Sequence, residues 1–269
     1  MTDEMEQKCR RFREVLRGYG SVLIAYSGGV DSTLVALVAH QELGEKALPV
    51  LALSPSLPER ERRDALRVLD DLNVPYRTIS TAEDADPRYA ANGSDRCYFC
   101  KTELFGRLRE LANAEGWATI ADGIHAGDVN DHRHGITAAA ENGVSHPLLE
   151  AGLLKADVRA LARELGLANW DKPAMACVSS RVPTGVPITP RLLKQIEAAE
   201  DVLASLGFRQ FRVRHHGEAA RIELLPADLP RALENRGPLV AGIRAAGYRY
   251  VTLDLAGFRT DEAHLHVLS

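Results

Sequence analysis

A compact apolar run that passes directly into two adjacent glycines constrains this chain most. Residues 21–26 read SVLIAY, the pattern of a buried parallel strand, and residues 31–43 read as a mostly apolar helix. The pair Gly28 and Gly29 lies between them. Paired glycines let a backbone turn sharply and approach an anion closely, and the free N–H groups at a helix N-terminus bind phosphate. The segment therefore predicts a strand–loop–helix unit that binds a phosphate group.

The loop itself is specific. Residues 27–33 read SGGVDST, which matches the PP-loop signature SGGxDS and neither the Walker A pattern nor GxGxxG. A PP-loop binds the pyrophosphate end of ATP and favours attack at the α-phosphorus, which leaves an adenylate. The alternative is a glycine-rich turn with a Ser/Asp helix cap. The candidate ATP-binding residues are Ser27, Gly28, Gly29, Asp31, Ser32 and Thr33, with Asp31 either orienting the loop or helping to hold Mg²⁺.

Strand and helix patterns alternate along the first two thirds of the chain. Further strands are expected at 48–53, 75–80 and 117–122, and helices at 3–18, 58–72, 100–115, 131–142 and 155–165, with a short segment at 144–148. This alternation indicates an α/β fold with a doubly wound parallel sheet. After residue 171 the expected order is a Pro- and Gly-rich loop, a helix at 190–206, strands at 210–215 and 219–224, helical turns and a strand at 248–253. We predict a PP-loop domain over 1–175 and a smaller α+β substrate-binding domain over 176–269.

The composition and net charge of the chain argue against some classes of binding partner. The chain has 269 residues, 45% of them hydrophobic, and a net charge of -4. A protein that grips a nucleic-acid backbone over a wide surface usually has a basic excess, so we do not expect nucleic acid as the main partner. The N-terminal residues lack a signal-peptide apolar region, and no run reaches the roughly 18 apolar residues of a membrane span. We expect a cytoplasmic protein with no membrane partner.

The cysteines suggest chemistry beyond phosphate binding. Cys97 and Cys100 form a C-x-x-C motif, which alone is ambiguous between a redox pair, half a zinc site and cluster ligands. Cys177 lies in a loop of small residues beside Arg181, where a reactive thiol is expected. Three thiolates without a fourth suit an iron–sulfur cluster with one open iron. The alternatives are two buried apolar cysteines and a packed loop thiol, and Cys9 is given no role.

Three arginines are candidates for binding an anionic substrate. Arg181, Arg212 and Arg214 carry planar guanidinium groups that suit phosphate and carboxylate, and the last two alternate on one face of an expected strand. The alternative is a solvated strand face with surface ion pairs. The histidines could bind metal, although exposed loop or strand-end positions are the simpler interpretation; they are His125, His132, His134, His215 and His216.

Taken together, the motifs resemble the LarE family over nearly the whole chain. They are SGGVDST, DRCYFCKTELF, the Asp122-Gly123 loop, KPAMACVSSRVPTG and RVRHHGEAARIE. The LarE family consists of PP-loop sulfurtransferases that make the nickel-pincer nucleotide cofactor. The resemblance implies adenylation of a carboxylate of pyridinium-3,5-biscarboxylic acid mononucleotide, replacement of oxygen by sulfur, and release of AMP and pyrophosphate. It also implies a homo-oligomer, such as a hexamer.

The resemblance offers two sources of sulfur. One branch of the family sacrifices its own cysteine, which would be Cys177 here. The other holds a 4Fe–4S cluster on three cysteines, which match Cys97, Cys100 and Cys177, and takes an additional sulfide from a donor.

One stretch departs from the family pattern, and other functions stay open. Residues 124–134 follow a strand end, where α/β sheets bind ligands. Ile124 and His125 replace a small polar pair there, and Gly127, His132 and His134 also differ. This departure concerns the identity of the substrate more than the chemistry. The alternatives are thiolation of another small molecule or of tRNA, an ammonia-using ligase, which would need no cysteine trio, and a non-catalytic ATP sensor.

Overall fold

The computed structural model of the protein describes residues 3–128, 134–173 and 176–258. Contacts divide the chain into two compact units, Met1–Tyr89 with Ser94–Met175, and Ala90–Gly93 with Ala176–Ser269. The segment 90–93 thus belongs to the second unit, which the sequence did not suggest. Asn92 accounts for this assignment, because its side chain is buried and donates to the carbonyls of Pro183 and Val186 at 2.8 and 3.0 Å.

The first unit is built on a parallel sheet. Its strands are β1 (Val22–Tyr26), β2 (Ala47–Leu53), β3 (Arg77–Ser80), β4 (Thr119–Ala121) and β5 (Val144–Ser145). They lie in the order β3-β2-β1-β4-β5, and every neighbouring pair is parallel. The chain therefore starts at the centre of the sheet and winds outward in both directions. The predicted doubly wound sheet is confirmed.

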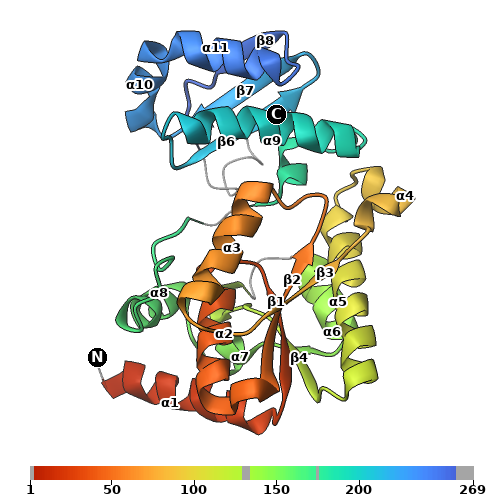
Figure 1. Ribbon diagram of the computed structural model, residues 1–269, viewed down its shortest axis with the longest axis vertical. Helices are drawn as coiled ribbons and strands as arrows, with labels where there is room; N and C mark the ends of the chain where they lie inside the picture. Colours follow the sequence, from red (N-terminus) through yellow and green to blue (C-terminus); the bar gives the residue numbers. More distant parts are fainter. Residues whose placement is uncertain (1–2, 129–133, 174–175, 259–269) are drawn as a thin grey trace. The chain divides into compact units, whose positions relative to one another are not determined.

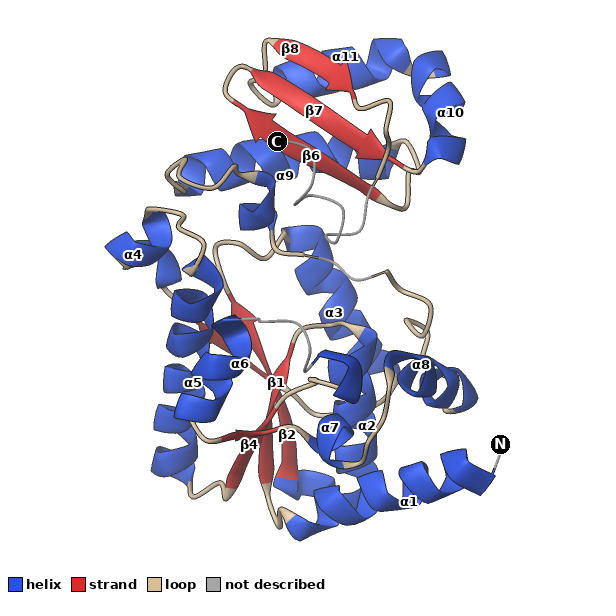
Figure 2. Ribbon diagram, turned by 180° about the vertical axis from the view of Figure 1, so that it is seen from behind, coloured by secondary structure: helices blue, strands red, loops and turns tan. Residues whose placement is uncertain are grey.

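Helices cover both faces of this sheet (Figures 1 and 2). They are α1 (Asp3–Gly18), α2 (Val30–Leu43), α3 (Glu59–Asp71), α5 (Arg96–Glu115), α6 (His134–Glu141), α7 (Pro147–Glu150) and α8 (Lys155–Glu164), and the short α4 (Pro87–Ala90) precedes α5. Strand β1 is buried on both faces. Val22, Ile24 and Tyr26 join the core formed with α1, α2, α3 and α8, whereas Leu23 and Ala25 join the core formed with α5 and α6. The period of two along a strand sends alternate side chains to opposite faces, and a continuous apolar run fills both cores.

Two element boundaries differ from the sequence prediction in ways that affect the site. Helix α5 begins at Arg96, four residues earlier than expected, so Cys97 lies in its first turn together with Cys100, which was expected at the start of the helix. The segment expected at 144–148 divides into β5 and α7, and Pro147 occupies the first position of α7, which suits its fixed φ. The start of the helix expected at 131–142 lies outside the described residues.

The second unit contains a smaller mixed sheet. Its elements are α9 (Pro190–Ser205), β6 (Phe211–His216), β7 (Ala219–Leu224), α10 (Leu229–Glu234), α11 (Arg236–Ala245) and β8 (Tyr250–Leu253). The strand order is β6-β7-β8; β6 pairs with β7 antiparallel, and β7 with β8 parallel. Helix α9 begins as predicted: Thr189 caps it by accepting from the Leu192 N–H at 3.2 Å, and Pro190 follows. The predicted smaller α+β domain is confirmed.

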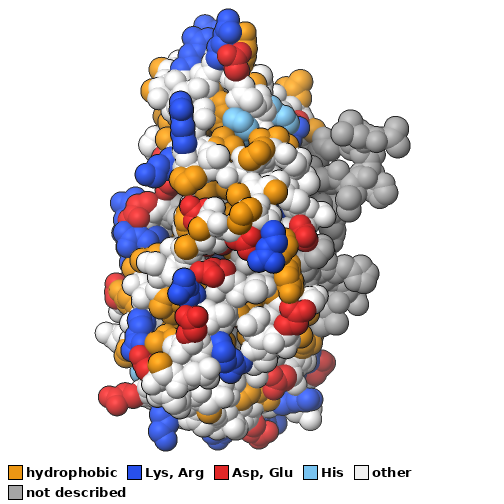
Figure 3. All heavy atoms as spheres, turned by 90° about the vertical axis from the view of Figure 1, so that its right-hand side faces the viewer, with side chains coloured by type: hydrophobic (Ala, Val, Ile, Leu, Met, Phe, Trp, Pro, Cys, Tyr) orange, Lys and Arg blue, Asp and Glu red, His pale blue; other side chains and the backbone are white. Residues whose placement is uncertain are grey.

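The surface shows no broad region of one charge on the face displayed in Figure 3, where Lys and Arg side chains are interspersed with Asp and Glu. Within the described residues, every helix is too short or too polar to cross a membrane.

Candidate active site

The PP-loop follows β1 and leads into α2. Gly28 turns the chain with φ at +75°, a conformation that favours glycine. The Ser32 hydroxyl then closes the loop on itself: it accepts from the Ser27 N–H at 3.2 Å and donates to the Gly29 carbonyl at 3.2 Å. The N-terminus of α2 is thereby held at the carboxyl edge of the sheet, where helix N–H groups and the helix dipole favour an anion.

Thr33 supports the loop from beneath. The sequence grouped it with the ligand-facing residues, but its side chain is fully buried and is not part of the cavity wall. Its hydroxyl donates to the Gly29 carbonyl at 2.8 Å and accepts from the Asn169 side chain at 2.9 Å. The same Asn169 amide donates to the Gly28 carbonyl at 3.2 Å. Thr33 and Asn169 therefore fix the loop geometry from the side opposite a ligand.

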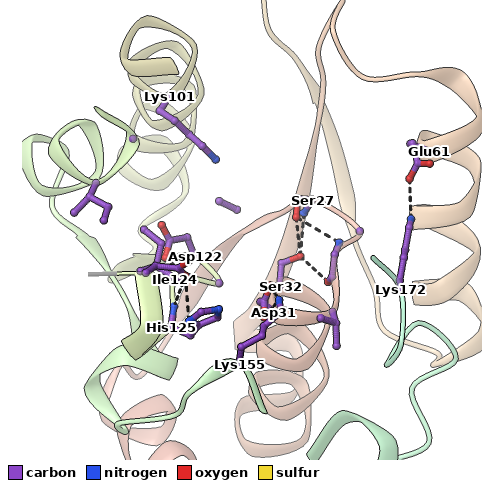
Figure 4. A pocket seen from close by; sticks show the side chains of 18 of the residues that line it. Ser27, Asp31, Ser32, Glu61, Lys101, Asp122, Ile124, His125, Lys155 and Lys172 are labelled. Carbon is purple, nitrogen blue, oxygen red and sulfur yellow. Dashed lines mark hydrogen bonds and ion pairs between the residues drawn. The ribbon is translucent and has the colours of Figure 1, made fainter. Parts of the chain in front are cut away.

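A cavity of about 560 Å³ opens above the PP-loop. Its wall comes entirely from the first unit: the loop residues Ser27–Ser32, the Asp122–His125 segment after β4, Lys101 and Phe105 of α5, and the start of α8. Figure 4 shows Lys101, Lys155 and Lys172 approaching it from three different elements. Cavities of this size hold small-molecule ligands, and this one joins a phosphate-binding loop to cationic side chains.

Ion pairs set the charge of the cavity wall. Lys155 Nζ lies 2.7 and 2.6 Å from the two carboxylate oxygens of Asp31, and Lys172 Nζ lies 2.8 Å from Glu61. Lys101 has no carboxylate partner among the described residues; its ammonium lies 5.6 Å from the centre of the Phe105 ring. Two of the three lysines thus form ion pairs with acids of the same wall, and an anionic ligand can replace those acids as the partner.

Asp122 is held by a histidine behind the wall. Its carboxylate accepts from the Ile124 N–H at 3.0 Å and lies 2.8 Å from His146 Nδ1. Burial lowers the pKa of His146, but the hydrogen bond and charge of Asp122, with the charge of Glu150, outweigh it and raise the pKa above its ordinary value of 6.5. A charged His146 therefore stabilises the Asp122 carboxylate at the cavity.

The His146–Asp122 pair predicts a pH-dependent stability. Because the folded pKa is raised, the contribution is fully present below about pH 6.5, the ordinary value, and is lost as the pH rises through the folded pKa. We expect the stability difference between the parent and His146→Gln to shrink as the pH rises above this value. Trp117 and Trp170 both belong to the first unit, so their fluorescence during urea unfolding reports on it. A pH-independent difference would contradict the coupling.

The predicted cysteines lie in different units. Cys97 is exposed and Cys100 is half-buried in the first turns of α5, and their spacing of three places them on one side of the helix. Lys101, in the cavity wall, follows directly. Cys177 is exposed in the second unit, at the start of a short 3₁₀ helix over Val178–Arg181. Within the described ranges, no group of three or more His, Cys, Asp and Glu side chains is arranged to hold a metal ion.

Two of the three predicted arginines, Arg181 and Arg214, form a buried charge cluster with two glutamates. Arg181 is 2% exposed and donates to Glu200 at 2.8 Å and to the Ala176 carbonyl at 2.9 Å. Arg214 lies 3.1 Å from Glu223 and donates to the Ser180 carbonyl at 2.7 Å. Burial lowers the pKa of Arg214, and the neighbouring charges of Arg212 and Arg181 lower it further. Arg181 and Arg214 both hydrogen-bond to Ser180, so this cluster anchors the loop that carries Cys177 to β6.

Arg212 occupies a different environment from its two neighbours. It is 5% exposed, and its guanidinium stacks 4.4 Å from the centre of the Phe258 ring. Whether any of the three arginines contacts a substrate stays a prediction.

The histidines differ in environment. His125 is 7% exposed and lines the cavity. Burial lowers the pKa of both His215 and His216 in the second unit, and His216 lowers that of His215 further. His132 lies outside the described residues, as does the side chain of His134.

Sequence reasoning missed the cavity lysines and the support residue. Lys155 meets Asp31 across 124 positions of sequence, and Asn169 meets Gly28 across 141. The sequence held only weak signals for these lysines: Lys155 is the first residue of an expected helix, and Lys172 directly precedes a proline. Partners this distant in sequence become visible only when the sheet brings their elements together.

Comparison with known proteins identifies the family. A family model described as NAD synthase matches residues 4–116. An uncharacterized protein of Synechocystis sp. is 43% identical over 258 residues, which cover 95% of this chain and 96% of that protein. The NH₃-dependent NAD⁺ synthetase of Helicobacter pylori is 26% identical over 246 residues, 82% of this chain and 91% of that enzyme.

The pyridinium-3,5-bisthiocarboxylic acid mononucleotide synthase of Lactiplantibacillus plantarum is 39% identical over 246 residues, 91% of this chain and 89% of that enzyme. The match extends through both units, whereas the NAD synthase model covers residues of the first part of the chain. A PP-loop at the carboxyl edge of a parallel sheet agrees with both. The chain therefore belongs to the LarE family of PP-loop, ATP-dependent sulfurtransferases.

Proposed function

We propose that this protein uses ATP to activate a carboxylate of pyridinium-3,5-biscarboxylic acid mononucleotide as an adenylate and then replaces an oxygen of that carboxylate with sulfur. The single observation that carries the proposal is the PP-loop cavity within a chain 39% identical to a named bisthiocarboxylic acid mononucleotide synthase. The product in that enzyme's name differs from the biscarboxylic acid by exchange of oxygen for sulfur.

The proposed first step is adenylation. A carboxylate oxygen of the substrate attacks the α-phosphorus of ATP, the bond from that phosphorus to the bridging oxygen breaks, and pyrophosphate leaves. The N–H groups of the PP-loop and the ammonium groups of Lys101, Lys155 and Lys172 would stabilise the leaving pyrophosphate. Asp31, whose carboxylate lies in the cavity wall, would hold Mg²⁺, which when bound neutralises charge on the phosphate chain.

The proposed second step replaces AMP by sulfur. A sulfur nucleophile attacks the activated carboxyl carbon, the carbon–oxygen bond to AMP breaks, and a thiocarboxylate remains. Cys97, Cys100 and Cys177 would hold a 4Fe–4S cluster, which when bound supplies an open iron for an external sulfide. Three cysteines outside any disulfide, two of them on one helix face, fit this group. In the alternative, Cys177 itself supplies the sulfur and becomes dehydroalanine, and Cys97 and Cys100 have no role.

Product analysis tests the adenylation. We expect AMP and pyrophosphate to form only when ATP and the carboxylated mononucleotide are both present. Formation of ADP and phosphate would exclude the PP-loop chemistry. Purification without oxygen, followed by iron and sulfide analysis, tests the cluster.

A second candidate is an ammonia-dependent ligase, because the NAD synthase model matches residues 4–116 and an NH₃-dependent NAD⁺ synthetase is 26% identical. The adenylation step would be the same, and ammonia would replace sulfur as the nucleophile. Competition between ammonium and sulfide in one reaction, with mass analysis of the product, distinguishes the two.

Arg212 gives a testable substrate contact. We expect Arg212→Lys to weaken binding of the mononucleotide while ATP binding stays intact. Lysine keeps the charge but loses the planar fork, and a hydrogen bond to a charged group is worth about 1.5–3 kcal/mol, roughly ten- to a hundredfold in affinity. Lysine is preferred to alanine because it keeps a positive charge near the buried Glu223.

Arg221→Lys is the matched control. Arg221 contacts Glu223 at 2.8 Å, but its side chain is 37% exposed on β7. Isothermal titration with the mononucleotide and with an ATP analogue compares the variants. Equal affinities in the parent and Arg212→Lys would make this arginine purely structural. A cytoplasmic location and a homo-oligomer stay predictions.

A further inference from the structure

The segment after β4 contributes a histidine to the wall of the PP-loop cavity. The ring of His125 lines the cavity on the same side as the Asp31–Lys155 pair (Figure 4). The side chain is only 9% exposed, so neighbouring atoms fix its orientation. A buried ring that faces a ligand cavity can act on a ligand through only one of its nitrogens.

A hydrogen bond from the backbone determines which ring nitrogen carries the proton. The Gly127 N–H donates to His125 Nδ1 at 3.1 Å, which requires a lone pair on Nδ1. Asp128 Oδ2, which accepts from the His125 N–H at 3.0 Å, lies farther from the same nitrogen than the Gly127 nitrogen does, at 3.4 Å. The arrangement places the ring proton of neutral His125 on Nε2. This nitrogen meets no hydrogen-bond partner among the described residues, and it is not among their fully buried atoms that lack one.

Gly127 makes room for the ring. A Cβ added at Gly127 would lie 3.2 Å from His125 Cε1 and 3.3 Å from Nδ1. The edge of the ring that contains Nδ1 and Cε1 therefore packs directly on this glycine. A larger residue at position 127 would press on the ring, so the position of His125 depends on Gly127.

We propose that His125 is a specificity-determining residue whose Nε2–H donates a hydrogen bond to a phosphate oxygen of ATP in the cavity. This inference rests on the proposed function, which places ATP above the PP-loop. Phosphate oxygens are hydrogen-bond acceptors, and a donor on Nε2 suits them at a wall where Asp31 already balances Lys155.

Three substitutions separate the donor from the shape of the ring. In His125→Gln the amide N–H takes the place of Nε2–H, and in His125→Asn the side chain can still accept from Gly127 but is too short to reach the ligand. His125→Phe removes both functions. With α,β-methylene-ATP as the probe in calorimetry, we expect the Phe and Asn variants to bind about ten- to a hundredfold more weakly, as for loss of a bond to a charged acceptor. The Gln variant should bind within about threefold of the parent, because it restores the donor.

Each outcome has a distinct meaning. If the parent does not bind the probe, the proposed function fails. If the parent binds it and His125→Phe binds equally well, or His125→Gln is as weak as His125→Phe, the inference is wrong. If only mononucleotide binding weakens in the Phe variant, the phosphate group is the substrate's own and the assignment to ATP is wrong.

A double-mutant cycle tests the coupling to Gly127. Gly127→Ala should weaken probe binding in the parent but have little effect in His125→Asn, since the shorter side chain leaves space for the methyl group. Nitrogen-15 NMR of labelled histidines, assigned with His125→Gln, gives a readout independent of binding. We expect the Nε2–H tautomer, and the Nδ1–H tautomer would overturn the proposal.

Discussion

We expect Gly28→Ala to lower the rate of AMP and pyrophosphate formation by at least about a hundredfold, which is the effect of removing one preorganised donor from a reaction site. Gly28 has φ at +75°, where an L side chain costs roughly 1–2 kcal/mol. The added Cβ would lie 2.5 Å from the Cβ of Ala65 on α3, a distance at which backbone must move. Either the loop or α3 shifts, and the N–H groups no longer point at the leaving pyrophosphate. Chromatography of nucleotide products measures the effect.

Gly29→Ala is the matched control for this substitution. Gly29 has φ at −78°, which any residue adopts, and the nearest atom to an added Cβ is the Ser27 hydroxyl oxygen at 3.4 Å. We expect the rate of AMP formation by Gly29→Ala to fall by less than about tenfold, equivalent to a change in activation free energy of less than roughly 1.4 kcal/mol. If Gly28→Ala turned over like the parent, the loop would not position the pyrophosphate. Tryptophan fluorescence of both variants verifies that the first unit remains folded.

Cys177→Ser is expected to abolish thiocarboxylate formation while adenylation and pyrophosphate release continue. The thiol is exposed and belongs to the second unit, whereas the PP-loop residues belong to the first, so its loss leaves the adenylation residues unchanged. Serine is close in size, but its hydroxyl is a poor nucleophile without an adjacent base. Mass spectrometry of the nucleotide product and a pyrophosphate assay give the two readouts. Loss of both activities together would contradict a role confined to sulfur transfer.

Two further measurements decide between the sulfur sources. If Cys177 is sacrificed, the intact protein loses about 34 Da after turnover, the mass of one H₂S, and Cys97→Ala remains active for that turnover. If sulfide comes from outside, the protein mass is unchanged and Cys97→Ala is inactive. Cys9→Ser is the control for cysteine replacement in general, because Cys9 packs against the core of the first unit and has no proposed role.

The first unit was largely predictable because its signals are local. The apolar run before Gly28 and the helix after it are continuous in sequence, and burial of β1 on both faces follows from that run alone. The mixed sheet of the second unit was less defined, since nothing in the sequence indicates that β7 and β8 pair in parallel.

The parts that were not predictable depend on distant partners. Arg181 and Glu200 are each buried, and only their pairing makes this possible; from sequence, Arg181 looked available to a substrate. Thr33 belongs to the PP-loop motif, but its partner Asn169 lies 136 positions away. The start of α5 was placed too late because Arg96–Phe99 carries no strong helix signal, and as a result Cys97 was expected just before the helix.

The membership of segment 90–93 in the second unit has a consequence for dissecting this enzyme. The backbone passes from one unit to the other at three places, after residues 89, 93 and 175. After a protease cut near residue 174, the N-terminal fragment would still carry Ala90–Gly93, which belongs to the second unit. The two fragments would therefore stay associated through the noncovalent contacts of this segment. A recombinant fragment that starts at residue 176 would lack Asn92 and leave the carbonyls of Pro183 and Val186 without its amide. A fragment over residues 1–175 contains every residue of the first unit, whereas production of the complete second unit requires that the Ala90–Gly93 segment be fused to it or supplied as a peptide.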